Sequence, residues 1–387
     1  MIKKDKKRIL IITSSYPKSP GDPSGTAGLF VSDFADSLTK LGYFVVVQPI
    51  GRSATYSNKG NKKIIIKPIP WNGGSDELAS ISLINPISIY RIIKLFFIGY
   101  FVIREAAKEY KINYILGMWF IPSGIFAYFI KKNLKINYDL WALGSDIWRV
   151  KKIPLIGEYL IKKVASEANN LMADGISLSN EVAKITKKIC IFTPSSRFSN
   201  NKHLKIIEKR NKLTRLNLIY IGRYHKNKGP DLLIEAIKLL DETMRKKINL
   251  EMYGLGNLES KIRSMANTYN LLEFIQINGP IDKVKMKNRF NECDFLVIPS
   301  RIESIPLIFS DAMHCNIPVI ANPAGDLGVI INKYSCGIVS NNVSPRSLAA
   351  AIIEAYQEGP NKFRNGVKLA SEKFNILSTT KHWVESI

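Results

Sequence analysis

The sequence predicts an α/β chain built from two doubly wound parallel-sheet domains. Short apolar runs of strand length alternate with amphipathic stretches of helix length, which is the pattern of strand–helix–strand units. The alternation breaks off once, near residue 195, and then restarts. A chain of 387 residues is also too long for one ordinary hydrophobic core, and a hydrophobic content of 46% is typical of a folded protein.

The first domain is expected over residues 1–195. It opens with a strand, RILIITSSYP, which leads into a Pro- and Gly-rich loop at 17–28 and then a helix, LFVSDFADSLTKLGY, closed by Gly42. With the next strand, FVVVQPI, these segments form the unit that right-handed crossovers join in parallel sheets. The alternation continues through IIIKPIP, a basic helix after Pro86, YILGMWF, a helix after Pro122, YDLWAL, LMADGIS and CIFTP.

A polar, basic stretch at 196–213 has the composition of a linker, and the second domain is expected over 214–372. Its predicted strands are LNLIYIGRY, INLEMYG, EFIQING, FLVIP, PVIAN and GIVS, with helices between them. Residues 373–387 close the chain as a further predicted helix. Ligands of doubly wound sheets bind at the carboxyl ends of the strands, so we expect the two halves to face an interdomain cleft.

The chain is strongly basic, with a formal net charge of +24, and both halves share the excess. Such a field favours an anionic partner: nucleic acid, anionic lipid or a phosphorylated substrate. The basic runs KKDKKR, NKGNKK, KKNLK and VKK, together with the helix IYRIIKLFFIGYFVIR, suggest contact with an anionic membrane surface. The alternative is an ordinary solvated lysine-rich surface.

Cysteine and histidine usage narrows the chemistry. The four cysteines show no CxxC or CxxH spacing, so we expect reduced thiols, a cytoplasmic location and no metal site. No histidine precedes His203, which excludes a histidine-dependent mechanism from the first half. The apolar stretch after the basic start is too short for an export signal, and residues 112–130 fit a strand, turn and helix better than a membrane span.

Three loops of the second half follow predicted strand ends. In IGRYHKNKGPDLL, Arg223 and Lys228 precede a helix, where cations and a helix N-terminus suit a phosphate, although a solvated basic loop is the alternative. YGLGNLES resembles a dinucleotide fingerprint, but Glu259 replaces its third glycine, and a carboxylate there disfavours the close helix packing of an NAD site. PSRIESIPLIFSDAM carries Glu303 and Asp311 across a helix start predicted at Pro306.

Taken in order, GRYHKNKGPDLLIEAI, YGLGNLE and NECDFLVIPSRIESIPLIFSDAMHCNIPVIANPAGDLGVI strongly resemble glycosyltransferase family 4, whose members are retaining enzymes of the GT-B fold. The resemblance covers most of residues 214–375 and continues more faintly through WFIPSG and LGSDIW in the first half. The acid–seven–acid spacing of Glu303 and Asp311 is its most specific part. In such relatives the closing helix crosses back to the first domain.

The resemblance implies roles for the residues of these loops. Glu303 would hold hydroxyls of a donor sugar, and Asp311 would bind the nucleotide ribose. The donor pyrophosphate would meet the helix N-terminus and the basic pair, in a site formed by Gly222, Arg223, Lys228, Gly254, Ser304, Ile305 and Leu307. Fixed cations lower the barrier to departure of a nucleoside diphosphate, so we expect no metal and no cofactor beyond the nucleotide sugar. Helix capping is the alternative role for Glu303.

First-half residues are expected to complete the site. Gly25 and Gly28 would let their loop approach the donor phosphates, or would simply form a flexible lid. Asp146 would position acceptor or donor hydroxyls, or cap the helix that follows it. Trp119 would stack on an acceptor sugar, with core packing as the alternative. The sequence departs from the family pattern at two donor-side positions, with Leu143 in place of a histidine and Asp311 in place of a glutamate.

The expected function is therefore retaining transfer of a hexose from a nucleotide sugar to a glycan or lipid-linked acceptor, in surface polysaccharide or glycolipid synthesis. Glu303, Arg223, Lys228 and Asp146 are the predicted catalytic residues. An epimerase or hydrolase of the same fold would want further acid–base groups in the cleft. A nucleic-acid-binding protein would explain the charge, but no RNA-binding or helix-turn-helix motif accompanies it.

Overall fold

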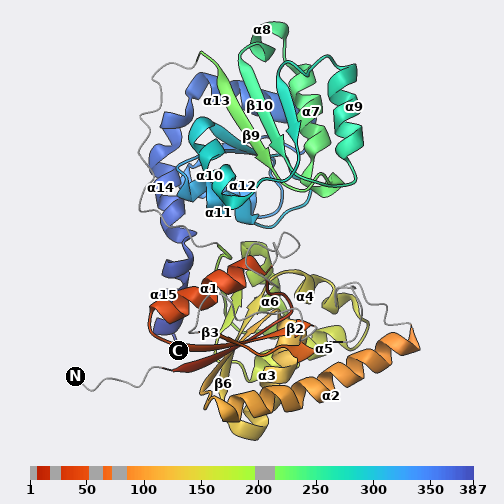
Figure 1. Cartoon of the computed structure of the whole chain (residues 1–387), viewed down its shortest axis with the longest axis vertical. Helices are drawn as coiled ribbons and strands as arrows, with labels where there is room; N and C mark the ends of the chain where they lie inside the picture. The colour runs from red at the N-terminus through yellow and green to blue at the C-terminus, as the bar shows by residue number, and fades with distance from the viewer. Residues whose placement is uncertain (1–6, 18–27, 52–63, 72–84, 197–213) are drawn as a thin grey trace, which may run out of the picture. The chain divides into compact units, whose positions relative to one another are not determined.

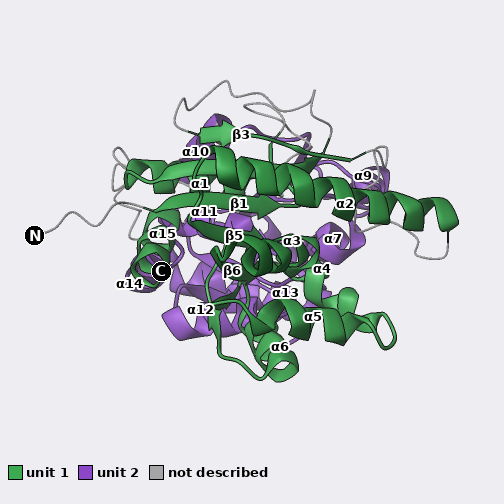
Figure 2. Ribbon diagram, turned by 90° about the horizontal axis from the view of Figure 1, so that it is seen from below, with its two compact units in different colours: residues 1–198, 376–387 green, residues 199–375 purple. Residues whose placement is uncertain are grey.

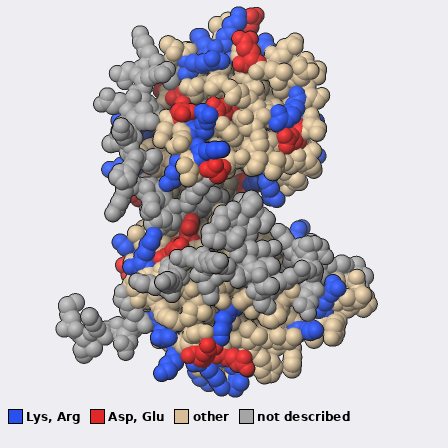
Figure 3. Space-filling view, in the orientation of Figure 1, with Lys and Arg blue, Asp and Glu red and all other residues tan. Residues whose placement is uncertain are grey.

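The chain forms two compact units in a computed structural model that describes residues 7–17, 28–51, 64–71, 85–196 and 214–387, without the side chain of Lys283 (Figure 1). Unit 1 comprises residues 1–198 together with 376–387, and unit 2 comprises residues 199–375 (Figure 2). On the face drawn in Figure 3, basic side chains occur on both units. The expected strand–helix alternation is present in each.

Unit 1 is built on a parallel sheet in the order β3-β2-β1-β5-β6-β7-β8, with β4 paired to β2. Its strands are β1 (Arg8–Thr13), β2 (Phe44–Gly51), β3 (Ile64–Ile66), β4 (Ile69–Pro70), β5 (Tyr114–Met118), β6 (Asn137–Ala142), β7 (Leu171–Ala173) and β8 (Cys190–Phe192). The central strands are buried and mostly apolar, as expected of a parallel sheet covered by helices, with Thr13, Gln48 and Asp139 as buried polar exceptions.

The helices of unit 1 are α1 (Leu29–Lys40), α2 (Pro86–Glu109), α3 (Phe120–Leu134), α4 (Ser145–Trp148), η3 (Val150–Lys152), α5 (Gly157–Ser166), α6 (Ile176–Thr186) and α15 (Ile376–Glu385). The last of these returns to unit 1 and packs beside α1 (Figure 1). Trp383 of α15 is 3% exposed and donates its indole N–H to Asp139 Oδ2 at 2.8 Å, which anchors the end of the chain.

Unit 2 is built on a six-stranded parallel sheet in the order β11-β10-β9-β12-β13-β14. The strands are β9 (Leu216–Ile221), β10 (Ile248–Tyr253), β11 (Ile275–Asn278), β12 (Phe295–Ile298), β13 (Val319–Ala321) and β14 (Gly337–Val339). The helices are η5 (Lys226–Lys228), α7 (Pro230–Leu239), α8 (Glu242–Arg245), α9 (Glu259–Thr268), α10 (Lys283–Glu292), α11 (Leu307–His314), α12 (Leu327–Tyr334), α13 (Pro345–Glu358), η6 (Pro360–Phe363) and α14 (Arg364–Lys373).

Two local expectations differ from the structure. The strand expected at LMADGIS stops at Ala173, and α6 begins three residues later at Ile176, because Gly175 takes an extended conformation as its N-cap. The helix expected from Pro306 begins at Leu307, with Pro306 as its N-cap in extended conformation. The segment 112–130 contains β5, a turn and the first part of α3, as predicted.

Candidate functional site

The candidate site lies at the carboxyl edge of the unit 2 sheet. Strands β10, β9 and β12 are neighbours there, so the loops that leave them, 222–229, 254–258 and 299–306, come together although they are far apart in the sequence. This edge is where doubly wound sheets bind their ligands. The topology therefore assembles the three loops that the sequence singled out.

Glycines hold the first two loops in backbone contact. A Cβ on Gly254 would lie 1.9 Å from the carbonyl oxygen of Gly222, and a Cβ on Gly256 would lie 2.3 Å from that of Tyr224. The Tyr224 amide also donates to the Leu255 carbonyl at 2.8 Å. Only glycine permits this approach, so these glycines first of all pack the two loops together.

This arrangement does not support a dinucleotide-binding site at YGLGNLES. Glu259, at the place of the third fingerprint glycine, begins α9 and pairs with Arg263 one turn further on, at 2.9 Å. Its side chain therefore forms an ion pair along the surface of its own helix.

The third loop is fastened to the first by Arg301, which the sequence did not indicate. Its guanidinium binds Asp231 at both oxygens, at 2.7 and 2.9 Å, and its amide donates to the Asn227 carbonyl at 2.8 Å. Burial alone would raise the pKa of Asp231, but the Arg301 bonds and charge outweigh it and lower that pKa. Asp231 is thus held as a carboxylate, and the planar bidentate pair fixes the position of one loop against the other.

Lys228 and Glu303, the predicted phosphate cation and the predicted sugar carboxylate, form an ion pair with each other. The Lys228 side chain is 26% exposed and that of Glu303 is 13% exposed, so solvent screens the pair only partly. Ser300 Oγ lies 3.5 Å from the same carboxylate oxygen of Glu303. Gly325, at φ +56°, packs closely against the backbone carbonyl of Glu303, because a Cβ on Gly325 would lie 1.8 Å from that oxygen.

The pair stands beside the start of α11. Pro306 at the N-cap makes no side-chain cap bond, and the Glu303 carboxylate accepts hydrogen bonds from Lys228 and Ser300. Pairing with a cation thus accounts for Glu303 better than helix capping does. The first-turn amides of a helix have no intrahelical acceptor and suit an anion, which is the role expected for the Leu307 amide. Ser304 and Ile305 precede the N-cap, so their amides lie in the loop before α11, and the phosphate contact expected for them stays a prediction.

Two other predicted donor residues of unit 2 differ in accessibility. Arg223 is exposed, and its carbonyl accepts the Tyr220 hydroxyl at 2.9 Å, so its loop is fixed while its side chain reaches solvent. Asp311 lies within α11 and is only 7% exposed. A ribose would therefore meet the Asp311 carboxylate only at its small accessible surface.

In unit 1, Asp146 is buried and organises two strand ends. It is 3% exposed, and its carboxylate accepts the amides of Phe120, at 2.6 Å, and Leu143, at 3.1 Å. Burial raises the pKa of Asp146 to about 6, against the lowering effect of these backbone bonds. The contacts show a residue that ties the loop after β5 to the loop after β6, and its assignment to catalysis stays a prediction.

The other first-half residues have diverse surroundings. Gly28 is in close backbone contact, since a Cβ there would lie 2.6 Å from Tyr16 Cα. Gly25 is outside the described residues. Trp119 is half-buried at a positive φ of 66° and its ring lies 6.0 Å from that of Phe30, whereas Trp141 is fully buried in the core. Of these two tryptophans, Trp119 is the one with accessible surface for a sugar.

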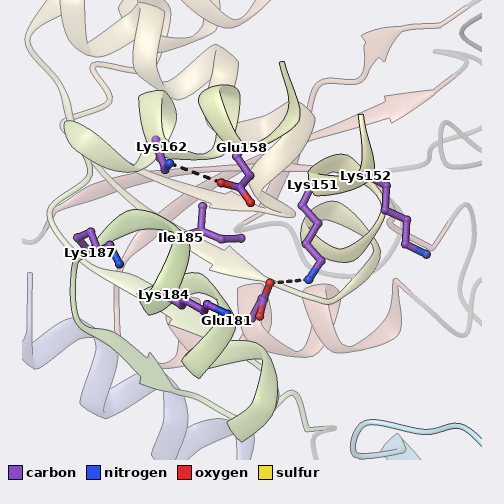
Figure 4. A pocket seen from close by; sticks show the side chains of 8 residues that line it. All are labelled: Lys151, Lys152, Glu158, Lys162, Glu181, Lys184, Ile185 and Lys187. Carbon is purple, nitrogen blue, oxygen red and sulfur yellow. Dashed lines mark hydrogen bonds and ion pairs between the residues drawn. The ribbon is translucent and has the colours of Figure 1, made fainter. Parts of the chain in front are cut away.

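A pocket of about 480 Å³ lies in unit 1, and none of the residues discussed so far lines it (Figure 4). Lys151 pairs with Glu181 at 2.5 Å, and Lys162 pairs with Glu158 at 3.5 Å. The full lining is Lys151, Lys152, Glu158, Lys162, Glu181, Lys184, Ile185 and Lys187. The lysines outnumber the two glutamates, so the pocket is positively charged. Within the described ranges, no group of three or more His, Cys, Asp or Glu side chains is placed to hold a metal ion.

Residues 202–373 match the family model of Glycosyl transferases group 1. An uncharacterized glycosyltransferase of Methanocaldococcus jannaschii is 26% identical over 266 residues, covering 68% of this chain and 71% of that protein. D-inositol 3-phosphate glycosyltransferase of Paenarthrobacter aurescens is 29% identical over 210 residues, covering 51% of this chain and 49% of its own length. The chain thus spans about half of the latter relative. The family match and the relatives together support a glycosyltransferase.

Solved structures resemble the chain over almost its whole length. Sucrose-phosphate synthase from Thermosynechococcus elongatus gives a TM-score of 0.72 at 16% identity, covering 98% of each chain. HepE from Anabaena, solved in complex with UDP, gives a TM-score of 0.71 at 14% identity, also covering 98% of each. With the two parallel-sheet units, these likenesses confirm the predicted GT-B fold.

Proposed function

We propose that this chain, whose second unit matches the group 1 glycosyltransferases, is a retaining and metal-independent hexosyltransferase. It would take a sugar from a nucleotide-sugar donor and pass it to a glycan or lipid-linked acceptor, in surface polysaccharide or glycolipid synthesis. The observation that carries the proposal is the Lys228–Glu303 ion pair, which stands at the ends of β9 and β12 beside the start of α11. Its two members have the chemistry for the two parts of such a donor, phosphate and sugar.

Donor binding would exchange partners within this pair. The pyrophosphate would take Lys228, Arg223 and the α11 amides, and the Glu303 carboxylate would turn to hydroxyls of the donor sugar. Both new contacts are charge-assisted hydrogen bonds, which are stronger than neutral ones. Glu303 would therefore bind the sugar through hydrogen bonds without becoming covalently attached to it.

The transfer itself breaks the bond between the anomeric carbon and the phosphate oxygen, and the electron pair stays on that oxygen. The acceptor hydroxyl attacks from the face that the phosphate leaves, which retains the configuration, and its proton passes to the departing phosphate oxygen. Negative charge develops on the nucleoside diphosphate as it leaves. Arg223, Lys228 and the α11 N-terminus would stabilise that charge electrostatically, which is why no metal is needed in the proposal.

Donor binding measured without metal tests the proposal. Calorimetry with UDP-, GDP-, ADP- and dTDP-sugars would compare the wild type with Glu303→Ala and with a control, Glu242→Ala, whose side chain is 73% exposed in α8. We expect one donor to bind selectively, with affinity lost in Glu303→Ala and kept in the control. Absence of binding by every donor, alongside salt-dependent RNA binding, would contradict the proposal and favour the nucleic-acid alternative.

A further inference from the structure

Helix α2 is packed on one side and bare on the other. Its inner side chains, Leu95, Ile103, Ala106 and Ala107, are 0–2% exposed, and a Cβ on Gly99 would lie 2.7 Å from the ring of Phe126 in α3. The helix is nevertheless long and apolar enough to cross a membrane by length and composition, and only 17% of its apolar window is buried. Apolar helices of soluble proteins are mostly buried, whereas most of the apolar window of α2 is not.

The bare side carries a continuous group of large apolar residues. Ile93, Phe97 and Phe101 recur every four residues and are 62%, 67% and 44% exposed. The rings of Phe97 and Phe101 lie 5.1 Å apart, and Tyr100 reaches Phe129 of α3 at 6.5 Å. We call this surface the α2 patch, with the members Tyr90, Ile93, Phe97, Phe101 and Phe129. Exposed apolar surface that is contiguous in this way marks an interaction site.

Cations border the α2 patch. Arg91, Lys94 and Arg104 lie on the helix itself, and no acidic residue occurs between the first and the last of them. On the α3 side, the ring of Tyr128 lies 5.6 Å from both Lys132 and Lys163, the latter on α5. An apolar centre with a basic border is the arrangement that inserts between the headgroups of an anionic bilayer.

Other occupants fit this surface less well. A membrane-crossing α2 would have to leave its packing on α3 and carry three cations into hydrocarbon, which is costly. A second copy of the chain would bring the same cations against one another. We infer that the α2 patch docks on an anionic lipid surface, with α2 parallel to the membrane plane and its aromatic side chains at headgroup depth. This inference is independent of the proposed transfer reaction.

Vesicle flotation of the purified full chain tests the inference, using vesicles of phosphatidylcholine alone and of equal parts phosphatidylcholine and phosphatidylglycerol. The apolar variant is Phe97→Ser with Phe101→Ser. Its control is Leu272→Ser with Leu369→Ser, which removes apolar side chains of similar exposure, 58% and 55%, from unit 2. The charge variant is Arg91→Gln with Lys94→Gln, and Lys261→Gln with Lys368→Gln is its control.

We expect binding to the anionic vesicles only, reduced about tenfold or more in the apolar variant and about fivefold for each cation removed, with both controls unchanged. Thermal midpoints equal to the wild type would show that the variants fold. Binding that is equal in variants and controls would overturn the inference. So would a wild-type dimer that ignores vesicles and that Phe97→Ser with Phe101→Ser converts to a monomer, because a second copy would then be the occupant.

Discussion

At the scale of single residues, Lys228 and Glu303 each provide the charge partner of the other. Each would otherwise be a charge only partly exposed to water, which is unfavourable. The pair therefore holds both side chains in place, and in the proposed donor complex phosphate would replace Glu303 beside Lys228 while sugar hydroxyls would replace Lys228 beside Glu303. The backbone of the two loops is fixed by Arg301 and the glycine contacts, so the proposed exchange would involve the two side chains and little of the backbone.

Replacing Lys228 tests how much its charge contributes to donor binding. We expect Lys228→Gln to weaken nucleotide-sugar binding about 10- to 100-fold, because it removes a charge-assisted hydrogen bond to phosphate. The control is Lys226→Gln in the same loop, whose side chain is exposed and should affect affinity little. Isothermal calorimetry measures both. Equal effects in the two variants would mean that general charge, and not the position of Lys228, determines affinity.

Asp146 gives a prediction about pH. Burial raises its folded pKa from 3.8 to about 6, so between these values the folded chain holds a proton that the unfolded chain has released. The free energy of unfolding should therefore fall, through this group, as the pH rises from about 4 to about 6. Asp146→Asn does not titrate and should make that dependence shallower.

The same substitution should also lower stability by about 1–3 kcal/mol, because asparagine offers one acceptor oxygen to two buried backbone N–H groups. Urea unfolding at a series of pH values measures both effects. The control is Glu385→Gln, an exposed carboxylate of the same unit. A pH profile identical in wild type and Asp146→Asn would show that Asp146 does not titrate in this range.

At the scale of elements, Gly229 is the joint between η5 and α7. It caps both, at φ +66°, and a Cβ there would lie 2.0 Å from the carbonyl oxygen of Pro299 at the start of the Glu303 loop. We expect Gly229→Ala to lower the free energy of unfolding by about 1–3 kcal/mol through backbone strain, and to weaken donor binding by displacing that loop.

Gly279 supplies the matched control, since a Cβ there would have no atom within 4 Å. Gly279→Ala should change stability by no more than about 0.5 kcal/mol. Chemical denaturation and donor calorimetry on both variants make the comparison. If Gly229→Ala were as stable as Gly279→Ala, the contact with Pro299 would be softer than its geometry indicates.

The alternation of strands and helices was predictable because buried parallel strands are apolar throughout and Gly, Pro and polar clusters separate them. The helix α6 was not, since the apolar run LMADGIS hides the change from β7 to helix at Gly175. The motifs predicted Lys228 and Glu303 in loops that follow strand ends, and those loops are neighbours in the structure. The Arg301–Asp231 pair was not, because its members are 70 residues apart and meet only once β9 and β12 have become neighbours. Periodicity carries no information about such a contact.

At the scale of the whole molecule, the net charge of +24 should act on the rate of donor capture. A field of one sign extends about 30 Å from a surface at 0.01 M salt but only about 8 Å at 0.15 M. It attracts an anionic nucleotide sugar from beyond the range of direct contacts.

Raising the salt concentration between these limits should therefore slow association by about tenfold, while the dissociation rate, set by short-range contacts, changes much less. Stopped-flow mixing with a fluorescent nucleotide-sugar analogue measures the two rates separately. Lys228→Gln provides the contrast, because it should raise the dissociation rate and leave most of the salt dependence of association intact. An association rate indifferent to salt would mean that the basic surface serves another partner, such as the lipid surface inferred for the α2 patch, and contributes nothing to donor capture.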